Sequence, residues 1–115
     1  MHRPLSEMGQ FTISILNGLD IEVAQQFSSK DENKRRERLK YFTGVKGRRH
    51  ISGAVAVLHC NVVREVDCGT HTALFAEVDE SGVHMPDAKP LLYFRQAFHV
   101  PAANPAPLWP QHPGT

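Results

Sequence analysis

Cysteine, long apolar runs and an excess of charge of one sign are all scarce in this sequence. Only two cysteines, Cys60 and Cys68, occur among 115 residues, too few for a disulfide scaffold. No apolar run approaches the roughly 20 residues that span a bilayer, and the start of the chain lacks the apolar centre of a signal peptide. We therefore expect a cytoplasmic protein whose thiols stay reduced and whose stability comes from a packed core.

The charges nearly cancel, because 13 Lys and Arg side chains face 12 Asp and Glu side chains. No overall field then draws the chain to nucleic acid or to an anionic membrane, and we expect neither as a partner. The basic residues gather in residues 30–40, where carboxylates interrupt them and no aromatics alternate with them. This stretch predicts a solvated loop or helix surface, with a small nucleic-acid-binding site as the alternative.

Recognisable phosphate loops and metal-ligand spacings are also missing. The sequence has neither a GxGxxG motif nor a glycine-lysine phosphate loop. His59 and Cys60 are adjacent in a predicted strand and point to opposite faces, and no close pair completes a set with Cys68 and His71, so we expect no metal site. Cys60 is one of the alternating apolar positions of a predicted strand. This position indicates a buried thiol rather than a nucleophile.

One domain is all that the length allows. Residues 1–10 show no periodicity and form an N-terminal segment, and residues 101–115 form a tail that contains five of the eight prolines. Residues 11–100 therefore hold the domain, which contains no internal repeat.

The pattern of the domain predicts a mainly β fold with a helix. Residues 11–16 alternate as a strand, with Phe11, Ile13 and Ile15 on one face. The period then lengthens, which predicts a helix that Asn17 caps and that ends near Phe27. Three further strands are expected at residues 54–66, 72–78 and 90–95, separated by turns at residues 67–69 and 80–82. About four strands with open edges favour a homodimer.

Six segments in this order resemble the flavin reductase-like domain family, whose fold is an FMN-binding split β-barrel. They are residues 11–16, Phe27 with Ser28, the aromatic-glycine turn at residues 42–44, the alanine-rich strand at residues 54–60, the turn Gly69, Thr70, His71 and Thr72, and the closing strand at residues 90–95. The resemblance implies the C-terminal portion of that family, a partial split β-barrel that lacks the N-terminal strands.

The family resemblance implies a dimeric reductase that binds FMN or FAD, takes hydride from NADH or NADPH, and often supplies reduced flavin to a separate monooxygenase. It places His71 near the flavin and the nicotinamide, as the catalytic position. The implied cofactor-binding residues are Ile13, Ser14, Phe27, Ser28, His71, Tyr93, Phe94 and Arg95.

A second interpretation remains open beside this one. A truncated copy would be a noncatalytic dimeric split-barrel module without flavin, in which His71 only closes a hairpin by bonding the turn. For Tyr93 and Phe94, the alternative to contact with an aromatic ligand is core packing. Visible flavin absorbance of the purified protein separates the two interpretations.

Overall fold

A computed structural model describes residues 9–102, and strands are the commonest secondary structure among them. The predicted mainly β fold with a helix is confirmed. The predicted N-terminal segment and proline-rich tail lie almost entirely outside the described residues. The elements are β1 (Gln10–Ile15), α2 (Ile21–Ser28), α3 (Glu32–Glu37), the 3-10 helix η1 (Arg38–Tyr41), β2 (Phe42–Thr43), β3 (His50–Ile51), β4 (Ala56–Cys68), β5 (His71–Val83), β6 (Leu92–Phe94) and β7 (Ala97–His99).

The main sheet has three antiparallel strands in the order β1, β4, β5. Phe11 pairs with Cys60 and Ser14 pairs with Val57, so the strand's apolar and hydroxyl side chains alternate between the two faces as predicted. Val57 is 2% exposed and Cys60 is 4% exposed. The buried thiol predicted at Cys60 is therefore confirmed.

The β4–β5 hairpin is the longest structure in the chain, with 13 residues in each strand. Cys68 pairs with His71, which leaves Gly69 and Thr70 as the turn, and Gly69 takes the positive φ of 70° that suits glycine there. The predicted turn is thus confirmed, shifted by about one residue.

The second predicted turn, at residues 80–82, is wrong. Gly82 pairs with Val57, and β5 continues to Val83, because β4 offers partners along its whole length. A β-bulge interrupts the pairing here. Val78 pairs with Cys60 and Glu80 pairs with His59, so Asp79 lies opposite no residue of β4 in the strand register.

Helix α2 begins after a turn that Asn17 holds. The side chain of Asn17 accepts a hydrogen bond from the amide of Leu19 at 3.0 Å, but the N-cap of the helix is Asp20. The predicted capping role of Asn17 is therefore wrong by three positions.

Residues 30–40 form α3 and η1, which contain no buried residue, so the predicted solvated surface is confirmed.

Two short hairpins complete the described chain. β2 pairs with β3, and β6 pairs with β7. The strand predicted at residues 90–95 is shorter, because Arg95 and Gln96 take positive φ angles of 51° and 62° and form the turn. Within residues 9–102 there are seven strands and two α-helices, where the sequence predicts about four and one. The additional strands have only two or three residues, too few for a visible alternation.

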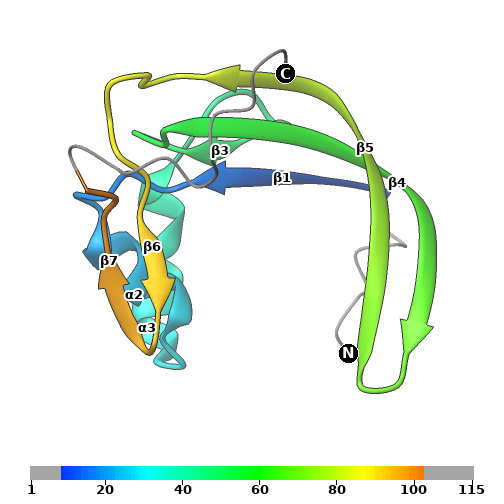
Figure 1. The fold of residues 1–115 in the computed structure, drawn as a ribbon, viewed down its shortest axis with the longest axis horizontal. Coiled ribbons are helices and arrows are strands. Elements are labelled where there is room, and N and C mark those ends of the chain that lie inside the picture. The colour runs from blue at the N-terminus through cyan, green and yellow to red at the C-terminus, as the bar shows by residue number, and fades with distance from the viewer. Residues whose placement is uncertain (1–8, 103–115) are drawn as a thin grey trace, which may run out of the picture.

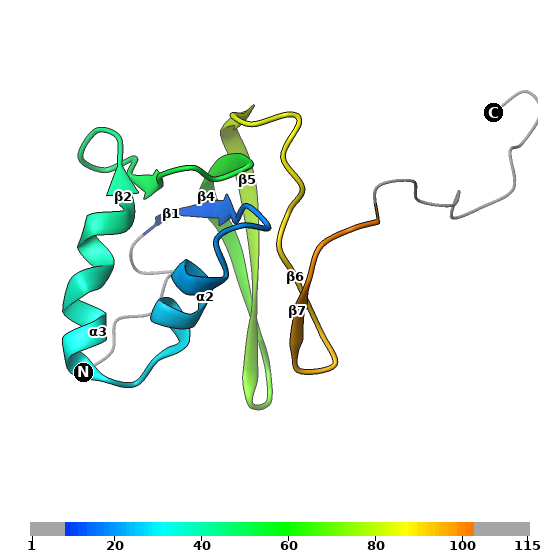
Figure 2. The same ribbon diagram turned by 90° about the vertical axis from the view of Figure 1, so that its left-hand side faces the viewer.

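The hairpins extend in different directions from the sheet. Figure 1 shows that β4 and β5 bend together, so that their turn lies on the opposite side of the molecule from α2, α3 and the β6–β7 hairpin. In the perpendicular view of Figure 2, the two helices appear on one side of the β4–β5 hairpin and the β6–β7 hairpin appears on the other. Among the described residues, no helix is long and apolar enough to cross a membrane.

Candidate functional site

A cavity of about 270 Å³ opens between β1, α2 and the β2–β3 hairpin. A wider depression of about 670 Å³ shares three of its lining residues, Thr12, Phe42 and Arg49, and adds Lys46 and Gly47. The cavity is lined by Thr12, Ser14, Leu16, Phe27, Phe42, Arg49 and Ile51. Apolar walls, hydroxyl groups and two cations thus surround one space, and neither lining contains a carboxylate.

The hydroxyl wall of the cavity comes from the alternation of β1. Thr12 and Ser14 share the sheet face that looks toward β3, and the Ser14 hydroxyl accepts a hydrogen bond from the backbone amide of Ile51 at 3.1 Å. Because that oxygen is engaged as an acceptor, its own proton stays available to a ligand. Ser14 can therefore donate a hydrogen bond into the cavity.

Phe27 in the last turn of α2 forms the aromatic wall. Its ring meets Phe42 edge to face at 5.7 Å between centroids. The Arg38 guanidinium stacks over the same ring at 5.3 Å, and it donates to the carbonyls of Phe27 and Ser29 at 2.8 and 2.9 Å. Arg38 thus satisfies carbonyls at the helix C-terminus, which fixes the ring's position. The sequence showed this arginine only as part of a charged run.

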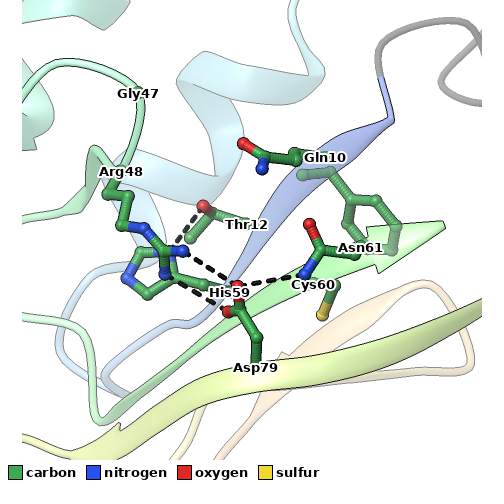
Figure 3. A pocket seen from close by; sticks show the side chains of 9 residues that line it. Gln10, Thr12, Gly47, Arg48, His59, Cys60, Asn61 and Asp79 are labelled. Carbon is green, nitrogen blue, oxygen red and sulfur yellow. Dashed lines mark hydrogen bonds and ion pairs between the residues drawn. The ribbon is translucent and has the colours of Figure 1, made fainter.

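A polar cluster beneath the loop between β2 and β3 fixes that loop to the sheet (Figure 3). Arg48 binds Asp79 through two nitrogens at 2.8 and 3.2 Å and reaches Glu80 at 3.0 Å. Asn61 donates to Asp79 at 3.0 Å. The hydrogen bond from Arg48 lowers the pKa of Asp79, with Asn61 adding to the effect, and the same bond raises the pKa of Arg48.

Two of the predicted cofactor residues, Ser14 and Phe27, line the same cavity. Ile13 points to the other face of β1 and is 45% exposed. Ser28 is exposed, and its hydroxyl donates to the carbonyl of Gln25 at 3.1 Å. Of the neighbours Ile13 and Ser14, and Phe27 and Ser28, the structure therefore places only Ser14 and Phe27 at the cavity.

His71 lies elsewhere, at the end of the β4–β5 hairpin. It is exposed, and its ring nitrogen is 2.9 Å from the hydroxyl of Thr70. Tyr93 and Phe94 on β6 are 66% and 62% exposed, and the Arg95 guanidinium lies over the Phe94 ring at 5.3 Å. None of these residues lines the cavity of Ser14 and Phe27, and their roles remain predictions.

Sequence reasoning missed several cavity residues, namely Thr12, Leu16, Lys46, Arg49 and Ile51. Strand alternation could have indicated Thr12 and Leu16, because both share a face with Ser14. Nothing local indicates Lys46 or Arg49, which a loop carries to the cavity. Both thiols are free, and among residues 9–102 no group of three or more His, Cys, Asp or Glu side chains is placed to hold a metal ion.

Comparison of the sequence with known proteins identifies a family. The family described as flavin reductase like domain matches residues 1–101. A ferric-chelate reductase (NAD(P)H) of Archaeoglobus fulgidus is 30% identical over 99 residues, which cover 80% of this chain and 56% of that protein.

Solved structures agree with the family match. The nitrilotriacetate monooxygenase component B homologue of Mycobacterium thermoresistibile has a TM-score of 0.74 at 22% identity, covering 92% of this chain and 60% of that one. The styrene monooxygenase flavin reductase of Pseudomonas putida S12 has a TM-score of 0.69 at 27% identity, covering 93% and 68%.

The chain spans 56% of the archaeal protein's length and 60% of the mycobacterial one. The predicted partial split β-barrel is confirmed, with no closed barrel among the described strands. The match across residues 1–101 and the shared fold together show that this chain belongs to the flavin reductase like domain family.

Proposed function

We propose that the chain binds FMN or FAD in the cavity beside Ser14 and Phe27 and transfers hydride to it from NADH or NADPH. The observation that carries the proposal is this cavity in a member of the flavin reductase like domain family. The adjoining depression of about 670 Å³ has the size of small-molecule sites, which enclose about 300–1,000 Å³, and the cavity of about 270 Å³ lies just below that range. Their aromatic wall and hydroxyl groups suit a planar heteroaromatic ring.

Each of the chain's own groups has a distinct task in this proposal. A bound flavin supplies the hydride acceptor. Ser14 donates a hydrogen bond to a ring heteroatom, and the edge-to-face pair of Phe27 and Phe42 provides a rigid apolar surface that excludes water. His71 orients the nicotinamide. It begins β5 at the turn of the β4–β5 hairpin, which lies across the molecule from α2 (Figure 1), so we assign it to a site that a second protomer completes.

The apolar face of the main sheet supports the homodimer. Ile13 and Ile15 of β1 are 45% and 38% exposed, and Val78 and Val83 of β5 are 49% and 65% exposed. Their pairing with β4 places all four on one face. An exposed apolar face of this kind is typical of a protein interface, and a second copy of the chain is the partner we propose.

A flavin-dependent monooxygenase is the proposed recipient of reduced flavin. The support is the likeness to the styrene monooxygenase flavin reductase, which is 27% identical. The noncatalytic module without flavin stays the second candidate. The observation that favours it is the exposed position of His71 at a hairpin end, where its bond to Thr70 is a sufficient structural role.

Titration of the purified chain with FMN, followed by flavin fluorescence, tests the proposal. We expect saturable quenching, and then loss of NADH absorbance when NADH and excess FMN are present. Phe27→Ala should weaken the quenching, whereas Phe75→Ala, which removes a 53% exposed ring from β5, should not. Absence of quenching by a folded protein would favour the noncatalytic module.

A further inference from the structure

Two adjacent arginines in the loop between β2 and β3 have different surroundings. Arg48 donates two hydrogen bonds to Asp79 and one to Glu80. Arg49 is exposed, and within the described residues it forms no hydrogen bond or ion pair. It lines both the cavity of Ser14 and the adjoining depression. One arginine therefore holds the loop, and the next presents its guanidinium to the cavity.

The space beside Arg49 is electropositive. Lys46 lines the same depression, and no Asp or Glu belongs to either lining. The carboxylate of Asp79 lines an adjoining pocket of about 50 Å³, which shares Thr12 and Gly47 with the depression, and Arg48 neutralises the carboxylate there (Figure 3). Two cations at the mouth of an apolar cavity favour an anionic ligand, because a guanidinium fork matches phosphate oxygens and an ammonium adds a point charge.

The loop that carries these cations is fixed at several points. Gly44 and Gly47 take φ angles of 97° and 88°, and the amide of Arg48 donates to the carbonyl of Val45 at 3.0 Å. On the far side, His50 pairs with Thr43 in the β2–β3 sheet. Because these contacts restrict the backbone, binding loses less conformational entropy than it would with a free loop.

We propose that Lys46 and Arg49 form a subsite for a phosphate group of the nucleotide cofactor. This inference rests on the proposed flavin reductase function and adds the part of the cofactor that the loop recognises. The phosphate belongs either to FMN or to the nicotinamide dinucleotide, which share the same chemistry. Arg48 is a positioning residue: it holds the loop on Asp79 and does not touch the ligand.

Comparison of FMN with riboflavin, which has the same ring but no phosphate, isolates the subsite. We expect the chain to bind FMN more tightly than riboflavin. Arg49→Ala should weaken FMN binding about tenfold, the loss of one charge-assisted hydrogen bond, and leave riboflavin binding unchanged. Lys46→Ala should act in the same direction with a smaller effect. Arg36→Ala removes an equal charge from exposed α3 and should change neither affinity.

A second arm assigns the phosphate if FMN is not its source. If Arg49→Ala leaves FMN binding intact but raises the KM for NADH or NADPH without lowering kcat, the subsite holds the nicotinamide cofactor. Equal binding of FMN and riboflavin, together with an unchanged KM in Arg49→Ala, would overturn the subsite and leave the flavin site standing. A folded chain that binds neither flavin would overturn both proposals.

Discussion

The hydroxyl of Ser14 on β1 accepts a hydrogen bond from the backbone amide of Ile51 on β3, at 3.1 Å and across 37 residues of sequence. This bond joins the main sheet to the small β2–β3 sheet. It also leaves the serine proton free to donate to a ligand in the cavity that both residues line. A single hydroxyl thus contributes to the fold and to the proposed cofactor site.

Ser14→Ala should therefore lower both stability and flavin affinity. Ile51 is 7% exposed, so its amide would lose its partner away from water, at a cost of about 1 kcal/mol. Urea unfolding and FMN titration measure the two effects. Ser81→Ala, at an exposed serine of β5, is the control and should change neither. Unchanged stability of Ser14→Ala would mean that solvent replaces the hydroxyl without cost.

The burial of β4 predicts how strongly valine substitutions along this strand reduce the free energy of unfolding. Val57 is 2% exposed, and Val57→Ala should reduce the free energy of unfolding by about 2 kcal/mol through lost burial and a cavity. Val63→Ala removes the same two methyl groups from a side chain on the same strand that is 62% exposed, and should cost less than about 0.5 kcal/mol. Denaturant unfolding compares the two variants, and equal losses would contradict this location of the core.

The Arg48–Asp79 pair predicts a pH dependence of stability. The pKa of Asp79 in the folded chain lies below its unfolded value of about 3.9. The pair therefore stabilises the fold above that pH, and its contribution is lost as the pH falls through the lowered pKa. We expect Tm to be higher for the native chain than for Asp79→Asn at pH 7, with the difference shrinking as the pH falls below the unfolded pKa. A difference that stays constant through that fall in pH would exclude a role for the Asp79 charge.

His71 predicts a separation of binding from turnover. If it orients the nicotinamide, His71→Ala should lower the rate of NADH oxidation more than the affinity for FMN. Steady-state kinetics and fluorescence titration on the same preparation give both quantities. Thr70→Ala removes only the hydroxyl that contacts the His71 ring and serves as the comparison. Equal losses of rate and affinity in His71→Ala would indicate a structural role at the hairpin end.

The apolar sheet face predicts a dimer that charge can disrupt. Sedimentation equilibrium at micromolar concentration should give twice the mass of one chain. Ile13→Lys should shift the equilibrium toward monomer, because it buries a charge in the proposed interface. Leu19→Lys is the matched control, since Leu19 is 90% exposed and precedes α2, outside the sheet. A folded native monomer would remove the basis for a site shared between protomers.

The sequence was sufficient to predict the longest elements and the turn that joins β4 to β5, but not the pairing of β1 with β4. Strand β1 and the β4–β5 hairpin have clear alternation and a glycine where the turn needs a positive φ. The false turn at residues 80–82 arose because polar residues and Gly82 are typical of turns. Whether such residues pair depends on the neighbouring strand, and Val57 of β4 provides the partner.

The site was less predictable than the fold. Family resemblance indicated Ser14 and Phe27, which line the cavity, and strand alternation makes Thr12 their neighbour. Arg49 reaches the cavity through a loop whose course depends on the tertiary pairing of Arg48 with Asp79. Sequence separations of this kind carry no local signal, because the partners are 31 residues apart.

Asp79, which holds the loop between β2 and β3 through Arg48, lies in the bulge of β5. This residue can therefore change without repacking of the sheet. Asp79 is an additional residue between Val78 and Glu80, whose partners Cys60 and His59 are consecutive in β4. Removal of Asp79 would leave every other cross-strand pair and every side chain's face as they are. Loop attachment and sheet stability are therefore separately adjustable. A one-residue deletion here is a milder change than it would be at any paired position of the strand.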